Sequence, residues 1–471
     1  MKKYCLLFCL ILFVLTNVSA QKYIDFKILY TNDNHGWIDS SQNYGGAADM
    51  YTHWKKNDHY KPRKDKFLVL SGGDLYTGPA LSSWFHGNST LEVLNAMKFD
   101  AVAVGNHEFD ITVDSLRAHS KRMNFPLLAA NIIDINTDTI PDYIKPYAFF
   151  NVNKLKIAII GLACENTPNQ TFPKNVKDYK FIAYQKALKE YLPEVKQQNP
   201  DIIMVLGHIG LEEAEKLVKF ANQNDIPILL NGHYHENYIT VRNGVYLVQA
   251  GCYMQAYTSI SVRYDVEKHK TIVLGATVHD NTHTKQNKKI ANIVNKWKAL
   301  ANEQLLENVG YCTEEISMKD KRFCKLICKF FTSEYPEYTI GFNNMGGMRQ
   351  GLKQGEITKM DILGVMPFDN KIAFLDVYGR DVIDASKRLE YCGFYKDENG
   401  EFFLDNGEKI KEDSIYKVVT TDYLFQTNYA LKKAVSSNLT ETHYTIPVFN
   451  FLKKNVSKEK SINVFLNEIK R

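Results

Sequence analysis

The first half of the chain alternates short apolar segments, each long enough for one buried strand, with segments of helical periodicity. Six apolar segments predict buried strands, at 26–30, 67–71, 100–104, 155–160, 202–206 and 226–230. Helical spacing recurs between several of them, at 46–56, 89–98, 112–123 and 181–198. Because such alternation is typical of sheets covered by helices, the pattern predicts an α/β domain. Residues 245–250 and 259–275 predict further strands, with the alternation expected at sheet edges.

The second half has a different pattern. Residues 284–308 repeat apolar side chains at helical spacing and predict one helix between the two halves. We therefore expect a first domain over 21–283, a linker helix within 284–310 and a smaller α+β domain over 311–471. In the last of these, the sequence predicts helices near 320–333 and 379–392, and strands near 338–342, 372–377 and 416–420.

Residues 1–20 have the pattern of a secretory signal peptide. Lys2 and Lys3 precede an apolar stretch at 4–15, and Val18-Ser19-Ala20 matches a cleavage site. The apolar stretch is short for a membrane span, so we expect export to the periplasm or the extracellular space and no membrane span in the mature chain. Of the eight cysteines, two lie in this segment, and the other six permit disulfides without fixing their pairing.

The charge pattern argues against a nucleic-acid polymer as partner. The formal net charge is +5 over 471 residues, and it is spread along the chain. The lysine-rich stretches at 285–289 and 453–460 are short and are typical of solvated surface. We therefore expect a small-molecule partner.

Side chains that can bind metal ions follow five of the six predicted strands, whereas the strand at 155–160 ends in GLAC. Singly, a His or Asp after a strand is more often a structural or turn residue. Together they are expected to converge, since ligands bind outside the carboxyl ends of strands in open α/β sheets. The candidates, in chain order, are Asp33, His35, Asp74, Asn106, His107, Asp110, His208, His233 and His235.

The residue types of this set predict a site for two divalent metal ions. Imidazole and carboxylate suit Zn, Mn or Fe, and the chain has no CxxC motif that would favour a thiolate zinc site. Two such ions need one bridging carboxylate and about three further ligands each. Such a pair lowers the pKa of a bound water and clamps the attacking and leaving oxygens of a displacement at phosphorus. The sequence therefore predicts a two-metal site that is suited to displacement at phosphorus.

The motifs that carry these residues resemble those of the calcineurin-like metallophosphoesterase superfamily. They read Asp33-x-His35, Gly73-Asp74, Gly105-Asn106-His107-Glu108, His208 and Gly232-His233-x-His235. The longer string GNHEFD and the segment FNNMGGMRQGLKQGEITKMDILGVMPFDNKI are similar to the 5'-nucleotidase family, over roughly 25–430. The resemblance implies an α/β metallophosphoesterase sandwich of two sheets flanked by helices, followed by a smaller α+β C-terminal domain. It also implies an active site between the two domains.

The resemblance also implies a role for each matched residue. One metal ion would be held by Asp33, His35, Asp74 and His235, and the other by Asp74, Asn106, His208 and His233, with Asp74 bridging. His107 would stabilise the phosphoryl group or protonate the leaving oxygen, and Asp110 would orient His107. In the second domain, the substrate would contact Asn344 (or its neighbour Asn343), Arg349, Phe368 and Tyr423.

One departure from the family pattern concerns the substrate. The family's Gly-Gly-Asp-Gly turn after the second aromatic residue is replaced by FQTNYAL at 425–431, with Tyr429 near the place of the Asp. The resemblance favours an exported 5'-nucleotidase that releases phosphate from nucleoside monophosphates by attack of a metal-bridging hydroxide. A 2',3'-cyclic nucleotide phosphodiesterase, a UDP-sugar hydrolase and another phosphoesterase on this scaffold stay open. A binding protein without activity is disfavoured, because every expected ligand, His107 and Asp110 are present.

Overall fold

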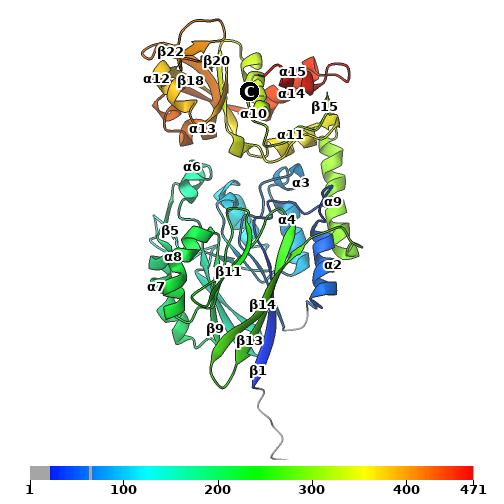
Figure 1. The fold of residues 1–471 in the computed structure, drawn as a ribbon, viewed down its shortest axis with the longest axis vertical. Helices are drawn as coiled ribbons and strands as arrows, with labels where there is room; N and C mark the ends of the chain where they lie inside the picture. Colours follow the sequence, from blue (N-terminus) through cyan, green and yellow to red (C-terminus); the bar gives the residue numbers. More distant parts are fainter. Residues whose placement is uncertain (1–21, 63–65, 470–471) are drawn as a thin grey trace, which may run out of the picture.

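The chain folds into two domains, one above the other in Figure 1. The computed structural model describes residues 22–62 and 66–469, and the predicted signal peptide at 1–20 lies outside the described residues. Helix α9 (Lys288–Leu305) runs along the side of the first domain and ends below the second (Figure 1). The expected limits at 283 and 310 stay predictions. Among the described helices, none combines the length and the apolar character that crossing a membrane requires.

The first domain is built on two six-stranded sheets. Their strand orders are β14-β13-β1-β2-β3-β4 and β11-β12-β10-β9-β7-β6. Four neighbouring strands in each sheet are parallel to one another. Each strand outside these four pairs antiparallel with its inner neighbour. The strands of the first sheet are β1 (Tyr23–Thr31), β2 (Phe67–Ser71), β3 (Ala101–Ala103), β4 (Leu127–Leu128), β13 (Ala256–Asp265) and β14 (Lys270–Asp280). Those of the second are β6 (Tyr147–Val152), β7 (Leu155–Leu162), β9 (Ile202–Gly207), β10 (Ile228–Leu230), β11 (Asn237–Arg242) and β12 (Val245–Ala250).

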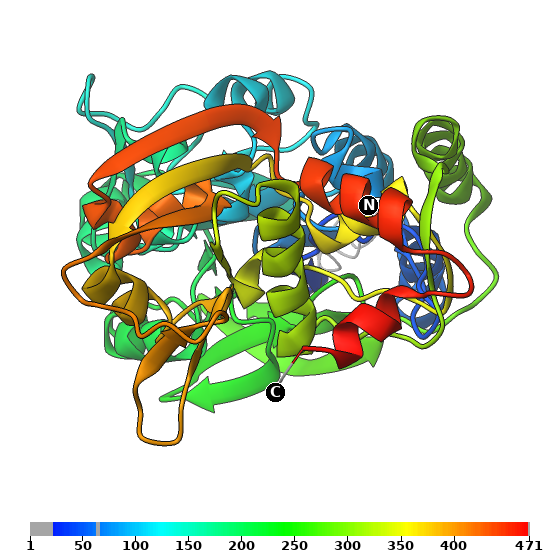
Figure 2. The ribbon, with the colours of Figure 1, turned by 90° about the horizontal axis from the view of Figure 1, so that it is seen from above.

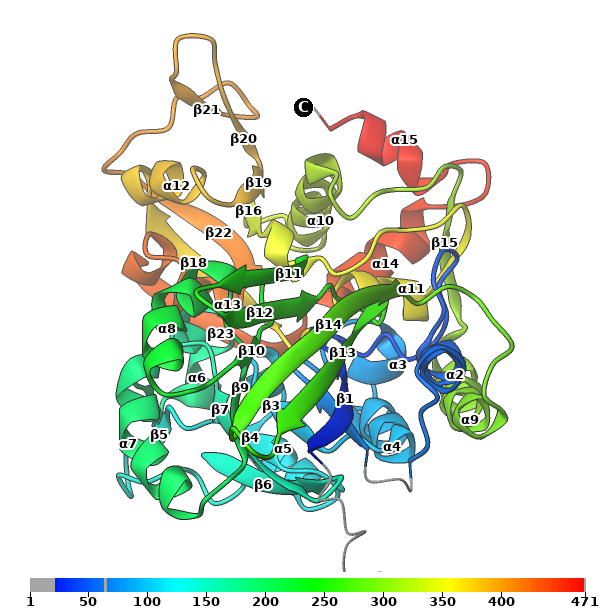
Figure 3. The same cartoon turned by 60° about the horizontal axis from the view of Figure 1, so that its bottom comes forward.

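The two sheets pack face to face, and helices cover their outer faces. Ile28 and Leu70 of the first sheet share an apolar core with Ile157 and Met204 of the second. Helices α2 (Ala47–Asn57), α4 (Asn88–Met97) and α9 lie on one side, and α7 (Tyr184–Gln197) and α8 (Leu211–Gln223) lie on the other (Figures 1 and 3). Alternate side chains of each strand therefore enter the central and the outer core, which explains the almost continuously apolar strands. The predicted two-sheet sandwich is confirmed.

The second domain contains a five-stranded sheet with the order β19-β16-β22-β18-β23. Seen from above, this domain covers one end of the first (Figure 2). Its strands are β16 (Ile340–Asn343), β18 (Lys371–Tyr378), β19 (Glu390–Cys392), β22 (Ile415–Thr421) and β23 (Ser436–His443). Its larger helices are α10 (Lys321–Glu334) and α14 (Thr445–Asn455), and its shorter helices are α11 (Lys359–Val365), α12 (Gly379–Ala385), α13 (Asp422–Thr427) and α15 (Ile462–Asn467). A small hairpin of β20 (Phe394–Lys396) and β21 (Phe402–Leu404) projects from its edge (Figure 3).

The further strands predicted at 259–275 are β13 and β14, which pair antiparallel and are joined by a turn in which His269 has a φ of 49°. One sequence-based expectation is wrong in its extent. The helix predicted at 379–392 ends at Ala385, and residues 390–392 instead pair with β16 as strand β19. Here, pairing with a distant strand outweighs the local helical pattern.

Substitution of the buried Trp54 tests how much the packing of α2 on the first sheet contributes to stability. Its side chain is fully buried, and its ring lies 5.7 Å from Tyr60, 5.8 Å from Phe99 and 6.2 Å from Tyr257, between ring centroids. We expect Trp54→Ala to lower the free energy of unfolding by about 3–5 kcal/mol, because the cavity removes these contacts. Urea unfolding measures the change. Tyr429→Ala, at a side chain that is 70% exposed, is the control; a Trp54→Ala effect no larger than the control's contradicts the packing described.

Candidate metal centre and active site

The structure brings all seven predicted metal ligands to one place. The loops after β1, β2 and β3 of the first sheet meet those after β9 and β10 of the second, beside the second domain. Three groups of side chains have ligand atoms within 4.8 Å of one another. They are Asp33, His35 and His235; Asp74, His208 and His233; and His35, Asp74 and His107. The last group places His107, which the sequence assigned to catalysis, directly beside the expected ligands.

The first cluster joins the two sheets. His35 Nε2 lies 3.0 Å from His235 Nε2, and His235 Nε2 lies 3.5 Å from Asp33 Oδ1. Asp33 also accepts the backbone N–H of His233, at 3.0 Å from Oδ2. Asp33 and His35 are fully buried, whereas the His235 side chain is 27% exposed. This cluster therefore has one side open to a ligand.

The second cluster centres on the carboxylate of Asp74. Its Oδ2 lies 3.1 Å from His208 Nε2 and 3.7 Å from His35 Nε2, so the same oxygen faces both clusters. His208 Nε2 also lies 3.2 Å from Asn106 Oδ1 and 3.2 Å from His233 Nδ1. A carboxylate in this position is placed to bridge two cations.

The hydrogen bonds behind the imidazoles decide which nitrogen faces the site. His35 Nδ1 lies 2.9 Å from the carbonyl of Thr77, and His208 Nδ1 lies 2.7 Å from the carbonyl of Gly72. Because a carbonyl accepts, each Nδ1 carries the proton, and in a neutral ring the lone pair of Nε2 points into the cluster. Lone pairs of nitrogen and oxygen about 3 Å apart repel one another unless a cation, either a proton or a metal ion, lies between them. The donor set therefore fits a bound metal ion.

Burial favours the neutral form of two of the histidines, which is the form of imidazole that binds metal ions. It lowers the pKa of His233 to about 3 and that of His235 to about 4. Burial, with the nearby charge of Asp74, raises the pKa of Asp33 to about 7 although the charge of His208 opposes it. A multivalent cation would stabilise the ionised form of this buried carboxylate, because its charge replaces the lost solvation.

The backbone at these ligands is unusual. Five expected ligands have left-handed conformations, with φ of 49° at Asp33, 45° at His35, 53° at Asp74, 85° at His233 and 59° at His235. Residues with a Cβ rarely adopt this conformation, and such strain persists only where the surrounding structure holds it. The turns after the strands are therefore shaped to point these side chains inward.

His107 and Asp110 form a closely paired dyad beside Asp74. His107 begins the 3-10 helix η1 (His107–Phe109), and one turn later Asp110 Oδ2 lies 2.6 Å from His107 Nδ1. The backbone N–H of His107 donates to Asp74 Oδ1 at 2.9 Å, which fixes the dyad relative to the clusters. Burial lowers the pKa of His107, but the charges of Asp110 and Asp74 outweigh it and raise the pKa above its usual value.

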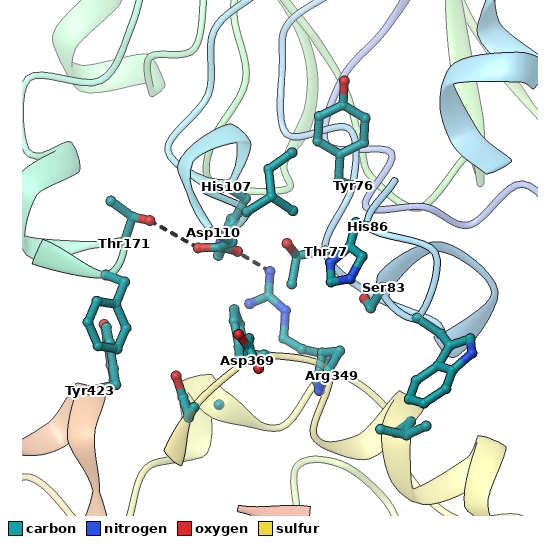
Figure 4. A pocket seen from close by; sticks show the side chains of 18 of the residues that line it. Tyr76, Thr77, Ser83, His86, His107, Asp110, Thr171, Arg349, Asp369 and Tyr423 are labelled. Atoms are coloured by element: carbon teal, nitrogen blue, oxygen red, sulfur yellow. Dashed lines mark hydrogen bonds and ion pairs between the residues drawn. The ribbon is translucent and has the colours of Figure 1, made fainter. Parts of the chain in front are cut away.

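The second domain places a cation against this dyad. Arg349 Nη2 lies 3.2 Å from His107 Nε2 and 3.3 Å from His35 Nδ1 (Figure 4). When His107 is protonated, two positively charged N–H donors lie side by side, and this arrangement is favourable only with an anion that accepts from both. The four residues predicted to contact substrate, Asn344, Arg349, Phe368 and Tyr423, line the same cavity as His107 and Asp110.

Three residues that sequence reasoning missed support the site. The buried carboxylate of Glu108 accepts the backbone N–H groups of Asp74, Leu75 and Gly105, at 2.6–2.8 Å. Thr171 donates to Asp110 Oδ1 at 3.0 Å, and Gln170 Nε2 lies 3.1 Å from His233 Nε2. Gln170 and Thr171 follow β7, the one predicted strand without a ligand motif, but they lie well beyond its end. Gln and Thr are common in loops, so neither residue could be recognised from the sequence as part of the site.

The residue that replaces the family's Asp does not enter the cavity. Tyr429 is 70% exposed, stands beside Lys433 and is not among the residues that line the cavity. Tyr423 instead faces Phe172 of the first domain, with ring centroids 6.3 Å apart. The six cysteines of the described residues are free thiols, so the structure pairs none of the cysteines that the sequence left open.

Comparison with known proteins places these features in a family. The family description "Calcineurin-like phosphoesterase" matches residues 26–237, and "5'-nucleotidase, C-terminal domain" matches residues 308–402. A 5'-nucleotidase of Vibrio parahaemolyticus is 28% identical over 424 residues, which cover 78% of this chain and 75% of that protein. Protein UshA of Escherichia coli is 26% identical over 487 residues, which cover 87% of this chain and 88% of that protein.

A solved structure shows the same fold. The 5'-nucleotidase precursor of Thermus thermophilus superposes with a TM-score of 0.77 at 18% identity, over 92% of this chain and 97% of that chain. Both matched regions follow one another in this chain in the order of the two observed domains. The chain is a metal-dependent phosphoester hydrolase and belongs to the 5'-nucleotidase family of calcineurin-like phosphoesterases.

Proposed function

We propose that this protein is an exported 5'-nucleotidase that releases phosphate from nucleoside monophosphates. The observation that carries the proposal is the shared cavity, in which the expected ligands Asn106 and His233 and the His107–Asp110 dyad of the first domain face Arg349 and two aromatic residues of the second. The names of the relatives from Vibrio parahaemolyticus and Thermus thermophilus support the same substrate class. The signal-peptide pattern supports export to the periplasm or the extracellular space.

Two divalent metal ions complete the proposed site. Asp33, His35, Asp74 and His235 would hold one ion, and Asp74, Asn106, His208 and His233 would hold the other. Imidazole and carboxylate donors suit Zn or Mn. When bound, such ions supply Lewis acidity and lower the pKa of water at the site.

The protein groups around this site bind and protonate the substrate. The Arg349 guanidinium, 3.2 Å from His107 Nε2, is placed to donate to the same phosphoryl oxygen as the imidazole. As the bond from phosphorus to the leaving oxygen breaks, His107 Nε2 gives its proton to that oxygen. Asp110 accepts the Nδ1–H and Thr171 binds its other oxygen, so the dyad keeps one tautomer and one orientation.

The aromatic residues are placed to bind the nucleoside. Phe368 lies 6.1 Å from the His107 ring, between ring centroids, and Tyr423 lines the cavity on the side of Phe172. Aromatic faces stack on any base, so we expect broad tolerance among bases.

Substrate consumption and product formation by residues 21–471 in the presence of Mn or Zn, followed by liquid chromatography together with an assay for inorganic phosphate, test the proposal. The substrates are AMP, UMP, 2',3'-cyclic AMP, UDP-glucose and an aryl phosphate. We expect turnover of both monophosphates and, because the proton donor is lost, a fall of about 10²- to 10⁴-fold in kcat for His107→Ala. His283→Ala, at an exposed histidine, is the matched control and leaves the rate unchanged. Turnover of only the aryl phosphate, or of only the cyclic nucleotide or UDP-glucose, contradicts the nucleoside monophosphate assignment.

Glu108 provides a test of the metal centre that does not depend on activity. Its carboxylate holds the turn that carries Asp74, and Glu108→Gln replaces one acceptor oxygen with an N–H donor facing backbone N–H groups. We expect the affinity for Mn, measured by isothermal titration calorimetry, to fall by about 10- to 100-fold, as for other supports of metal ligands. Glu441→Gln, at an exposed position, controls for the charge change. Equal affinities in the two variants show that Glu108 does not support the ligands.

A further inference from the structure

The cavity between the two domains is large for a single nucleotide. Its volume is about 940 Å³, which lies near the upper end of the range of about 300–1,000 Å³ for small-molecule sites. Its lining comes from both domains and from the end of the linker helix α9. There is therefore room for groups besides one nucleoside and its phosphate.

The cavity extends to both sides of the dyad. In Figure 4, Thr171 and Tyr423 lie on one side of Arg349, and Ser83 and His86 lie on the other. We call the first side the nucleoside arm (Thr171, Phe172, Lys174, Tyr423) and the other the second arm (Ser83, Trp84, His86, Gln304, Leu363). Since His107 and Arg349 lie between the arms, a phosphoryl group bound there has space for one substituent on each side.

Trp84 gives the second arm a preformed aromatic surface. It follows the short helix α3 (Ala80–Ser83), lines the cavity and is 43% exposed. Its indole Nε1 donates to Gln304 Oε1 at 2.6 Å, so the ring is anchored at its edge by α9. A fixed indole with exposed surface in a cavity is suited to stack on a planar or sugar ring at little entropic cost.

The charges around the second arm favour a ring over a second anionic group. Lys359 lines the cavity but pairs with Glu307, which also pairs with Lys453. The remaining members named above are neutral amide, hydroxyl and apolar side chains apart from His86. Of the other cations that line the cavity, Arg349 is at the dyad and Lys174 is in the nucleoside arm. A phosphate is therefore expected at the centre and an uncharged ring in the arm.

We infer that the second arm is a subsite for a ring on the far side of the scissile phosphate, with Trp84 as its specificity-determining residue. The substrate class is a nucleotide phosphodiester with a ring-bearing second alcohol, and the inference rests on the proposed function. In the reaction, the oxygen of water bonds to phosphorus, and one ester P–O bond breaks. The departing alcohol takes the proton of His107, which leaves a phosphate monoester and one alcohol.

The test compares thymidine 5'-monophosphate with its 4-nitrophenyl ester, thymidine 5'-(4-nitrophenyl phosphate). Liquid chromatography follows the consumption of each compound by the Mn-loaded protein and identifies the products. The quantity compared is kcat/KM for the diester divided by kcat/KM for the monoester. We expect this ratio to fall at least about fivefold in Trp84→Ala, which is the lower end of the effect of losing one stacking contact. Trp84→Phe, which keeps an aromatic face, retains most of the ratio. Tyr395→Ala, at a 45% exposed aromatic residue of the β20–β21 hairpin, leaves it unchanged.

The outcomes separate this inference from the proposed function. Turnover of the monoester without the diester overturns the subsite and leaves the nucleotidase proposal standing. A ratio that Trp84→Ala does not change overturns the role of Trp84. Turnover of the diester alone, with the expected fall in Trp84→Ala, supports the subsite and contradicts the monophosphate assignment. Turnover of neither compound overturns both.

Discussion

The structure depends on one buried carboxylate, that of Asp74. One of its oxygens accepts the backbone N–H of His107, and the other faces His208 and His35 at 3.1 and 3.7 Å. This side chain thus connects the two ligand clusters and the catalytic dyad. A carboxylate buried among imidazoles and other oxygens is unstable without a compensating cation. The packing of the two sheets, with their carboxyl ends at the same level, provides the position where that compensation is possible.

The surrounding chain maintains this position at some conformational cost. Left-handed residues turn the side chains of both sheets inward, and Glu108 satisfies the backbone N–H groups of the turn behind Asp74. The second domain then adds what the first lacks, which is a guanidinium for an anion and aromatic surfaces for rings. Because Arg349 touches both His35 and His107, substrate recognition and chemistry meet at the domain boundary.

Much of the first domain was predictable, because strands buried on both faces are apolar and end in recognisable motifs. The strand predicted at 67–71 coincides with β2, and the ligands after five strands converge as parallel strands require. The supporting residues were not predictable: Gln170 and Thr171 reach the site through a loop after a strand that carries no ligand. Glu108 belongs to the GNHE motif, but its role was not predictable, since a buried acid that binds backbone N–H groups has no spacing signature. The strand β19 was missed because its partner, β16, lies about 50 residues earlier in the chain.

The central claim is that the converging side chains hold two metal ions that share Asp74. Anomalous diffraction from crystals of the protein grown with Mn, recorded near the Mn absorption edge, tests it most directly. The account predicts two peaks, one among Asp33, His35, Asp74 and His235 and the other among Asp74, Asn106, His208 and His233, with the Asp74 carboxylate between them. A single peak, or peaks away from Asp74, would contradict it.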